Sequence, residues 1–368
     1  MIRRGLKSNP CCAAALAAGA CLAAFSARAE PVEEFYRGKT VTVISTGSVG
    51  SIYDLASRLT VKYIAKHLPG EPQTVAKVMT GAGHLVGTNH LYNIAPRDGT
   101  TLGAVGETIP LIQVLQPEKA KYDVAKFNWL GNPVINNLTI VSWHTSGITS
   151  IKQVFDQELI IGTGGPGSTS TQNPRALNNI LGTKFKIISG FPGAEIDLAM
   201  ERSEVNGRGG AIWSWWQTSK PQWIAEKKIN ILLQIGPRRA KGLEDVPLMT
   251  ELARNEAERR VLGLLSSSVN VGRPILTPPE VPADRVAALR AAFRKAMADP
   301  EYIAEAAKLH LDIEPTYGEE LQQYVEEIAA TPPELAKIAA ASIVEGRIFN
   351  CKEQVKDAKL CVSSGGGE

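Results

Sequence analysis

A run of β-branched residues that ends in a loop of small residues constrains this chain more than any other feature. The run covers 41–44, the loop covers 45–51, and a helical pattern begins at Ile52. At such a junction the first N–H groups of the helix have no partner within it, and the helix dipole adds positive potential. Glycine and serine let a guest approach the backbone closely. The junction is therefore typical of a site for an anionic group, either a phosphate or a carboxylate.

The same arrangement recurs further along the chain. Loops of small residues also occur at 79–83, 162–168 and 190–194. Four such loops in one chain predict a cleft lined with anion-binding helix ends.

The first 29 residues have the organisation of a secretory signal peptide. A basic start precedes an almost unbroken apolar run over 11–24, and Ala27 and Ala29 stand at the two positions that signal peptidase recognises. The run is too short for a comfortable membrane span. We therefore expect residues 1–29 to be cleaved and the mature protein to leave the cytoplasm. A lipoprotein modified at Cys21 is the alternative, but it would lack the usual leucine three positions earlier.

Removal of this peptide changes both the charge and the cysteine count. Of 40 basic and 37 acidic residues, 36 and 37 remain, because the peptide contains Arg3, Arg4, Lys7 and Arg28. The basic pI of the precursor therefore says nothing about nucleic acid. Only Cys351 and Cys361 remain of five cysteines. In an oxidising compartment they favour a disulfide, within a C-terminal tail over 351–368 whose Ser/Gly-rich end is typical of disorder.

Strands and helices alternate along the chain. The expected strands are 40–46, 73–79, 100–105, 138–143, 158–163, 185–189, 208–213 and 229–235. Helical spacing of apolar residues predicts a helix over 52–68, and the last third of the chain is rich in helical patterns. This alternation favours an α/β fold with mostly parallel sheets flanked by helices. The mature length of about 339 residues is enough for two domains with full cores.

Short motifs occur in a fixed order along this pattern. They are YDLASRL at 53–59, HLPGEP at 67–72, GAG at 81–83, APRDGT at 95–100, WLG at 129–131, GPGS at 165–168, GTKFK at 182–186 and AMERSEVNG at 199–207. This ordered set, over about 35–345, resembles the substrate-binding receptors of tripartite tricarboxylate transporters, also called Bug-type receptors.

The resemblance implies a two-domain, type II-like periplasmic-binding-protein clamshell. Domain I would be discontinuous, with residues 30–132 plus 250–350, and domain II would cover 133–249. A small carboxylate would bind between them, held by backbone amides, small hydroxyls and ordered waters, and closure would present the receptor to membrane permease subunits. The resemblance thus implies a periplasmic binding protein without enzymatic activity.

The loops indicate which residues contact the ligand. The expected ligand-binding residues are Gly47, Ser48, Gly50, Ser51, Tyr53, Gly81, Ala82, Gly83, His84, Ser168, Thr169, Ser170, Gly193, Ala194, Trp213 and Ser214. Because the loops at 46–51, 81–83 and 162–168 lack lysine and arginine, we expect neutral donors to hold one ligand carboxylate. His84 either pairs with that carboxylate or caps a helix. Trp213 either stacks on a flat ligand or packs between a strand and the following helix.

Rival motifs are weaker. Gly162-x-Gly164-x-x-Gly167 matches a dinucleotide fingerprint, but the acidic residue about 20 positions later is missing, and Pro166 stands in the critical loop. The five histidines form no metal-ligand spacing, and the chain has no G-x-S-x-G elbow. We therefore expect no cofactor, no metal site and no nucleic-acid partner.

Two other functions stay open at this point. One is a binding component that senses a carboxylate and signals to a membrane kinase without transport, and the other is a periplasmic hydrolase. Neighbouring permease genes would separate the first from a transport receptor, and turnover of a carboxylate ester would support the second. The ligand itself is equally open among aromatic acids, dicarboxylates, tricarboxylates and amino acids.

Overall fold

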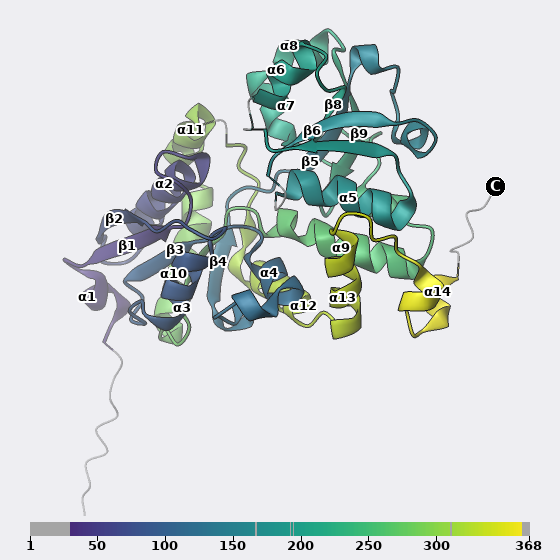
Figure 1. Cartoon of the computed structure of the whole chain (residues 1–368). Helices are drawn as coiled ribbons and strands as arrows, with labels where there is room; N and C mark the ends of the chain where they lie inside the picture. The colour runs from purple at the N-terminus through teal and green to yellow at the C-terminus, as the bar shows by residue number, and fades with distance from the viewer. Residues whose placement is uncertain (1–29, 166–167, 192, 194, 310, 363–368) are drawn as a thin grey trace, which may run out of the picture.

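The computed structural model describes residues 30–165, 168–191, 193, 195–309 and 311–362. Two lobes, each built around one β-sheet with flanking helices, lie side by side (Figure 1). The proposed signal peptide and Ala194 lie outside the described residues. Within those residues, no helix is both long and apolar enough to cross a membrane.

The first lobe contains a six-stranded sheet in the order β11-β4-β10-β3-β1-β2. Its strands are β1 (Thr40–Ser45), β2 (Gln73–Val78), β3 (Thr101–Ala104), β4 (Asn128–Asn132), β10 (Ile275–Thr277) and β11 (Thr316–Tyr317). β1 runs parallel to β2 and β3, whereas β10 runs antiparallel to β3 and β4, and β11 antiparallel to β4.

The second lobe contains a five-stranded sheet in the order β7-β6-β8-β5-β9. Its strands are β5 (Leu138–Trp143), β6 (Leu159–Thr163), β7 (Phe185–Ser189), β8 (Gly207–Ile212) and β9 (Ile229–Ile235). β6 runs parallel to β7 and β8, and β5 runs antiparallel to β8 and β9.

The two sheets share one strand order. In each, the first strand of a strand–loop–helix unit lies between the second and third, and a strand inserted beside the third comes from the segment that crosses between the lobes. The inserted strands are β10 and β5, and both run antiparallel to their neighbours. The sheets are mixed, but four of six strands in the first and four of five in the second run in one direction, so the predicted α/β fold with mostly parallel sheets is confirmed.

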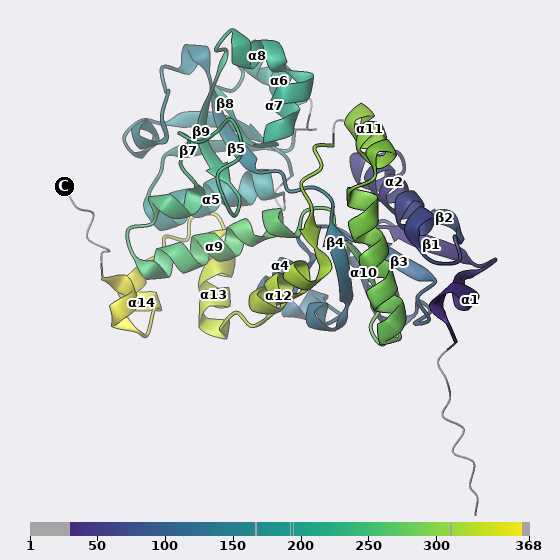
Figure 2. The same ribbon diagram turned by 180° about the vertical axis from the view of Figure 1, so that it is seen from behind.

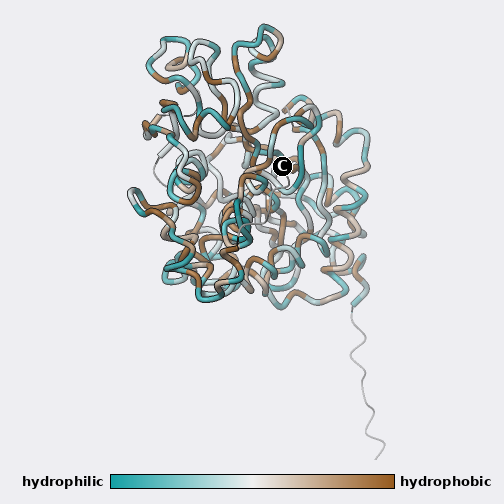
Figure 3. Tube along the Cα trace, turned by 90° about the vertical axis from the view of Figure 1, so that its right-hand side faces the viewer, coloured by the Kyte–Doolittle hydropathy of each residue, from teal (hydrophilic) through white to brown (hydrophobic). Residues whose placement is uncertain are grey.

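Helices cover both sheets. Those of the first lobe are α1 (Val32–Tyr36), α2 (Ile52–His67), α3 (Leu85–Asn93), α4 (Ile109–Leu115), α10 (Ala283–Met297), α11 (Pro300–Lys308) and α12 (Gly318–Ala329). Those of the second are α5 (Thr169–Leu181), α6 (Glu195–Glu201), α7 (Trp213–Ser219) and α8 (Pro221–Ala225). Hydrophobic and hydrophilic residues alternate along the trace (Figure 3), as amphipathic helices require.

One long helix joins the lobes. α9 (Glu256–Val271) runs beneath the second lobe toward the first (Figure 2). Its buried Val261, Leu262 and Leu265 belong to the same apolar cluster as Ile140 of β5 and Trp129 of β4. A continuous core therefore extends from one lobe to the other through α9.

The C-terminal segment is folded up to Val362. α13 (Pro333–Ser342) packs on α9, and α14 (Cys351–Gln354) follows it. The Cys351–Cys361 disulfide is present, which confirms the sequence prediction. Val355 and Leu360 pack against the joint core, so the part of the tail up to Val362 is ordered. The Ser/Gly-rich end beyond it lies outside the described residues.

The sequence located eight strands close to their observed positions but missed β4, β10 and β11. The strand predicted over 208–213 ends one residue earlier, because the chain begins α7 at Trp213. The charged run over 251–260 has the sequence pattern of a solvated helix face, but part of it is buried. Ala257 and Glu258 are buried at the start of α9, where the Arg254 guanidinium forms a salt bridge with the Glu258 carboxylate.

Candidate functional site

A cavity of about 50 Å³ lies where the two lobes meet. Tyr53 and Glu107 line it from the first lobe, and Leu138 and Ile212 line it from the second. Arg273 completes it from the segment between α9 and β10. The cavity sits beyond the carboxyl ends of β1 and β3, which is where open α/β sheets place ligands.

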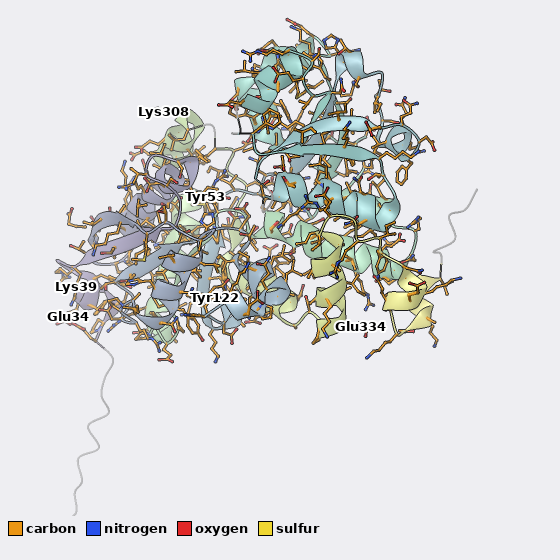
Figure 4. All side chains as sticks on the ribbon, in the orientation of Figure 1. Glu34, Lys39, Tyr53, Tyr122, Lys308 and Glu334 are labelled. Atoms are coloured by element: carbon orange, nitrogen blue, oxygen red, sulfur yellow. A yellow bond between two sulfur atoms is a disulfide. The ribbon has the colours of Figure 1, made fainter. Side chains whose placement is uncertain are left out.

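Tyr53 is the centre of this arrangement. It follows the first residue of α2, and its ring lies on the side of the first lobe that faces the second (Figure 4). The guanidinium of Arg273 stands 5.1 Å from the centroid of this ring, and the ring of His84 stands 5.6 Å from it. A second, smaller cavity of about 10 Å³ also touches both Tyr53 and Arg273. Tyr53 is therefore an aromatic wall shared by both cavities.

Arg273 and Glu107 bring opposite charges to the same cavity. The Nε atom of Arg273 is buried and has no hydrogen-bond partner among the described residues. Burial raises the pKa of Glu107, and the positive charge of Arg273 opposes that rise. Burial likewise lowers the pKa of Arg273, and the charge of Glu107 opposes this. The two groups feel each other electrostatically, yet no hydrogen bond or ion pair joins them in the described part of the chain.

The first predicted loop already contains an anion of its own. The buried carboxylate of Asp54 accepts a hydrogen bond from the Gly50 N–H (3.0 Å) and another from Nε of Arg58 (2.8 Å). Ser51 is the N-cap of α2, and its hydroxyl accepts from the Asp54 N–H (3.3 Å). Among the described residues, the N–H groups of Ile52 and Tyr53 keep no partner. Gly50 and Ser51 therefore stabilise the loop, and Tyr53 is the member that faces the cavity.

The rest of that loop lies on the surface. Gly47 is buried beneath the turn, and a Cβ there would stand 2.6 Å from the Cβ of Tyr53. Ser48 and Val49 are exposed, and Val49 is a large apolar side chain with 77% of its surface exposed. The loop therefore presents an uncovered rim above the cavity rather than its floor.

The Gly81–Gly83 turn holds His84 in place. Gly81, Ala82, Gly83 and His84 all have positive φ, and the three small residues are exposed. His84 occupies the N-cap position of α3, but its side chain makes no cap hydrogen bond. Its Nδ1 instead lies 2.8 Å from the Thr46 hydroxyl.

This contact fixes the tautomer of His84. The Thr46 hydroxyl donates its one proton to the Ala104 carbonyl (3.1 Å), so Nδ1 of His84 must donate to the hydroxyl oxygen. Burial lowers the pKa of His84, which favours the neutral ring. The His84 side chain therefore makes no cap hydrogen bond, and its contact with a ligand carboxylate stays a prediction.

The equivalent loop of the second lobe is built from hydroxyls. Ser168 is the N-cap of α5, and its Oγ lies 2.9 Å from Oγ of Ser170, which accepts from the Gly164 N–H (3.1 Å). Thr171 donates to the hydroxyl of Thr163 (2.8 Å). Among the described residues, the N–H groups of Thr169 and Ser170 have no partner. The loop carries no carboxylate, so this helix end stays available to an external anion.

The remaining predicted residues lie around this loop or away from it. Gly193 is exposed near Arg208. The Trp213 indole donates to the Lys241 carbonyl (3.0 Å), and its side chain belongs to an apolar cluster of the second lobe, which favours packing over ligand stacking. Ser214 is buried, and its hydroxyl accepts from the Asn136 amide (2.8 Å). Of the predicted residues that the structure describes, Tyr53 lines the larger cavity.

Sequence reasoning missed Glu107 and Arg273. Arg273 lies within Gly272-Arg273-Pro274, which resembles a simple break between elements. The sequence offers one signal for Arg273. It lies directly between an apolar helix and a short apolar strand, so its charge must lie close to the interior of the fold. Glu107 follows β3 in the same way that the first loop follows β1.

Comparison with known proteins defines the architecture further. No family model and no curated protein matches the chain. Among solved structures, a TctC solute-binding protein from Polaromonas without ligand has a TM-score of 0.64 at 16% identity, covering 82% of this chain and 98% of that one. MatC from Rhodopseudomonas palustris with bound malate has a TM-score of 0.54 at 18% identity, covering 81% and 99%. The periplasmic binding protein BugD has a TM-score of 0.55 at 18% identity, covering 83% and 98%.

The chain has the fold of the TctC-type solute-binding proteins. The predicted two-domain clamshell is thereby confirmed as an architecture. In this TctC-type fold the cavity lined by Tyr53, Glu107 and Arg273 lies between the two lobes.

Proposed function

We propose that this protein is a periplasmic solute receptor that binds a small carboxylate between its two lobes and delivers it to a tripartite tricarboxylate-type membrane transporter. The observation that carries the proposal is the cavity lined by both lobes, into which Arg273 brings a positive charge whose buried Nε has no hydrogen-bond partner among the described residues. A guanidinium with an unsatisfied buried N–H is complementary to a carboxylate, because charge-assisted hydrogen bonds are stronger than neutral ones.

Similar solved structures support the ligand class. One has malate bound, and another, from R. palustris, is described with adipate at a TM-score of 0.57 and 16% identity. Both ligands are small carboxylates. The signal-peptide pattern predicted for residues 1–29 supports the periplasmic location.

The proposed binding mode combines one charge with neutral donors. Arg273 would anchor the carboxylate from below, and the open N–H groups of Tyr53 and Thr169 would approach it from the two lobes, with the Ser168 hydroxyl beside them. Because these contacts come from both lobes, binding favours the closed state. For this motion we assign the first lobe to 30–132 plus 250–350, and the second to 133–249.

Native mass spectrometry tests the proposal. Protein purified from the periplasm without dialysis should carry one small acid, which is released on denaturation and absent from an Arg273→Gln variant prepared in the same way. A retained neutral compound would contradict the carboxylate assignment. Loss of uptake of the same acid in cells that lack the receptor tests the delivery role, and unchanged uptake would contradict it.

A further inference from the structure

The cavity between the lobes contains a carboxyl group that a simple carboxylate receptor does not need. Among the described residues that line it, Glu107 is the acidic one and Arg273 the basic one. Glu107 would stand beside any carboxylate that Arg273 attracts. The Glu107 carboxylate repels a second anion placed there. This repulsion is stronger than in bulk water, because the effective dielectric constant inside a protein is lower.

Neither group has an ion-pair partner among the described residues, although each acts electrostatically on the other. Nε of Arg273 has no partner, and the Glu107 carboxyl receives a hydrogen bond only from its own backbone among the described residues. Other charges close by are already matched. Asp54 is paired with Arg58. The pKa of His84 is lowered by burial, and its Nδ1 donates a hydrogen bond to the Thr46 hydroxyl. The cavity thus offers one positive and one negative group that do not touch each other.

A ligand that carries both charges answers this pair. We propose that Glu107 reads an ammonium group next to the carboxylate held by Arg273, so that the receptor prefers amino acids to acids that lack the amino group. This inference rests on the proposed carboxylate-binding function and names its ligand class. An ammonium on Glu107 and a carboxylate on Arg273 leave no buried charge unmatched, whereas a ligand without the amino group leaves Glu107 unmatched.

Calorimetric titration with matched pairs tests the proposal. The pairs are alanine with propionate, aspartate with succinate, glutamate with glutarate, and phenylalanine with 3-phenylpropionate. In the pair that binds best, the amino acid should bind about tenfold tighter or more, since a hydrogen bond between charged groups has that size. The Glu107→Gln variant should lose this preference by weakening the amino acid, with the partner acid unchanged or tighter.

A matched control and a folding check keep the result interpretable. Glu118→Gln makes the same change at an exposed position and should leave both affinities unchanged. Glu107→Asp keeps the charge and should retain part of the preference. If Glu107→Gln weakens both members of a pair equally, the residue has only a structural role and the proposal is wrong.

The possible failures are distinguishable. If the des-amino acids bind as tightly as the amino acids in wild-type protein, the receptor still binds carboxylates and only the inference about Glu107 falls. If no member of any pair binds, the proposed function falls as well.

Discussion

The same strand–loop–helix unit occurs in both lobes, but its helix end carries a carboxylate in the first lobe and hydroxyls in the second. In both, the first strand of the unit runs through a small-residue loop into a helix, β1 into α2 and β6 into α5. At α2 the Asp54 carboxylate takes the Gly50 N–H and pairs with Arg58. At α5, hydroxyls of Ser168 and Ser170 hydrogen-bond to each other, and no carboxylate is present.

This difference shows that a side chain of the helix itself can supply the negative charge that an anion-binding helix end favours. A helix N-terminus favours any carboxylate, and the nearest one in the sequence has the smallest entropic cost. The Asp54 carboxylate therefore offsets the positive potential at the α2 end, although the N–H groups of Ile52 and Tyr53 stay open, and the first half of the site needs another source of positive charge. Arg273, which reaches the same cavity from the crossing segment after α9, supplies it.

The largest expected effect comes from removing that charge. Arg273→Gln should weaken binding of the retained acid about 100-fold, because several charge-assisted hydrogen bonds are lost at once. Calorimetric titration measures the change. Arg58→Gln alters a half-exposed arginine at the filled helix end and should change the affinity less than threefold or so. Similar losses in the two variants would remove the contrast between the two helix ends.

The next effect is on stability. Asp54→Ala should lower the free energy of unfolding by about 2 kcal/mol, because the Gly50 N–H and the Arg58 guanidinium lose their acceptor. Urea unfolding measures this, and Asp54→Asn should cost less since an amide oxygen remains. The matched change at the other helix end, Ser170→Ala, should cost about 1 kcal/mol. Equal losses in the free energy of unfolding would show that Asp54 stabilises its helix end no more than Ser170 stabilises the other.

A smaller effect is expected on binding from the open end. Ser168→Ala should weaken the acid about fivefold without unfolding the protein, because one hydroxyl donor beside the open N–H groups is removed. Titration together with a thermal melt checks both parts. An unchanged affinity in Ser168→Ala would exclude that hydroxyl from the site.

Gly83→Val, by contrast, meets open space, and its cost comes from the positive φ of 62° rather than from a clash.

The smallest effect concerns the pH dependence of stability. The pKa of Glu107 is raised in the folded protein, so the folded state holds this proton more tightly than the unfolded state does. The resulting stability is fully present below the ordinary pKa of 4.5 and is lost as pH rises through the folded value. Glu107→Gln does not titrate, so its stability relative to wild type should increase from pH 4 to pH 7. Urea unfolding at both pH values checks this, and the opposite trend would contradict the burial of an unpaired carboxyl.

Local patterns predicted much of the fold. Runs such as 41–44 and 229–235 marked strands because their β-branched and apolar residues extend over a whole element. β10 has three residues beside prolines, too few for a periodic signal. The burial of Glu258 at the start of α9 was missed because the charged residues there resemble a solvated helix face, whereas tertiary packing buries this side chain beside Arg254.

The site was harder to predict than the fold. Tyr53 could be chosen because it follows the loop directly, and the glycines marked where the backbone turns. The hydrogen bond from Gly50 to Asp54 is local, but that Arg273 meets Tyr53 and Glu107 depends on segments more than 150 residues apart in the sequence. No local pattern contains that information.

The most direct test of the central claim compares a charged ligand with its neutral form. Calorimetric titration of the retained acid and of its primary amide measures what the carboxylate contributes. If Arg273 and the open end of α5 hold a carboxylate, the amide should bind at least about tenfold more weakly than the acid. Equal affinities would contradict the account, because they would mean that neither the charge of Arg273 nor the open helix end recognises the ligand.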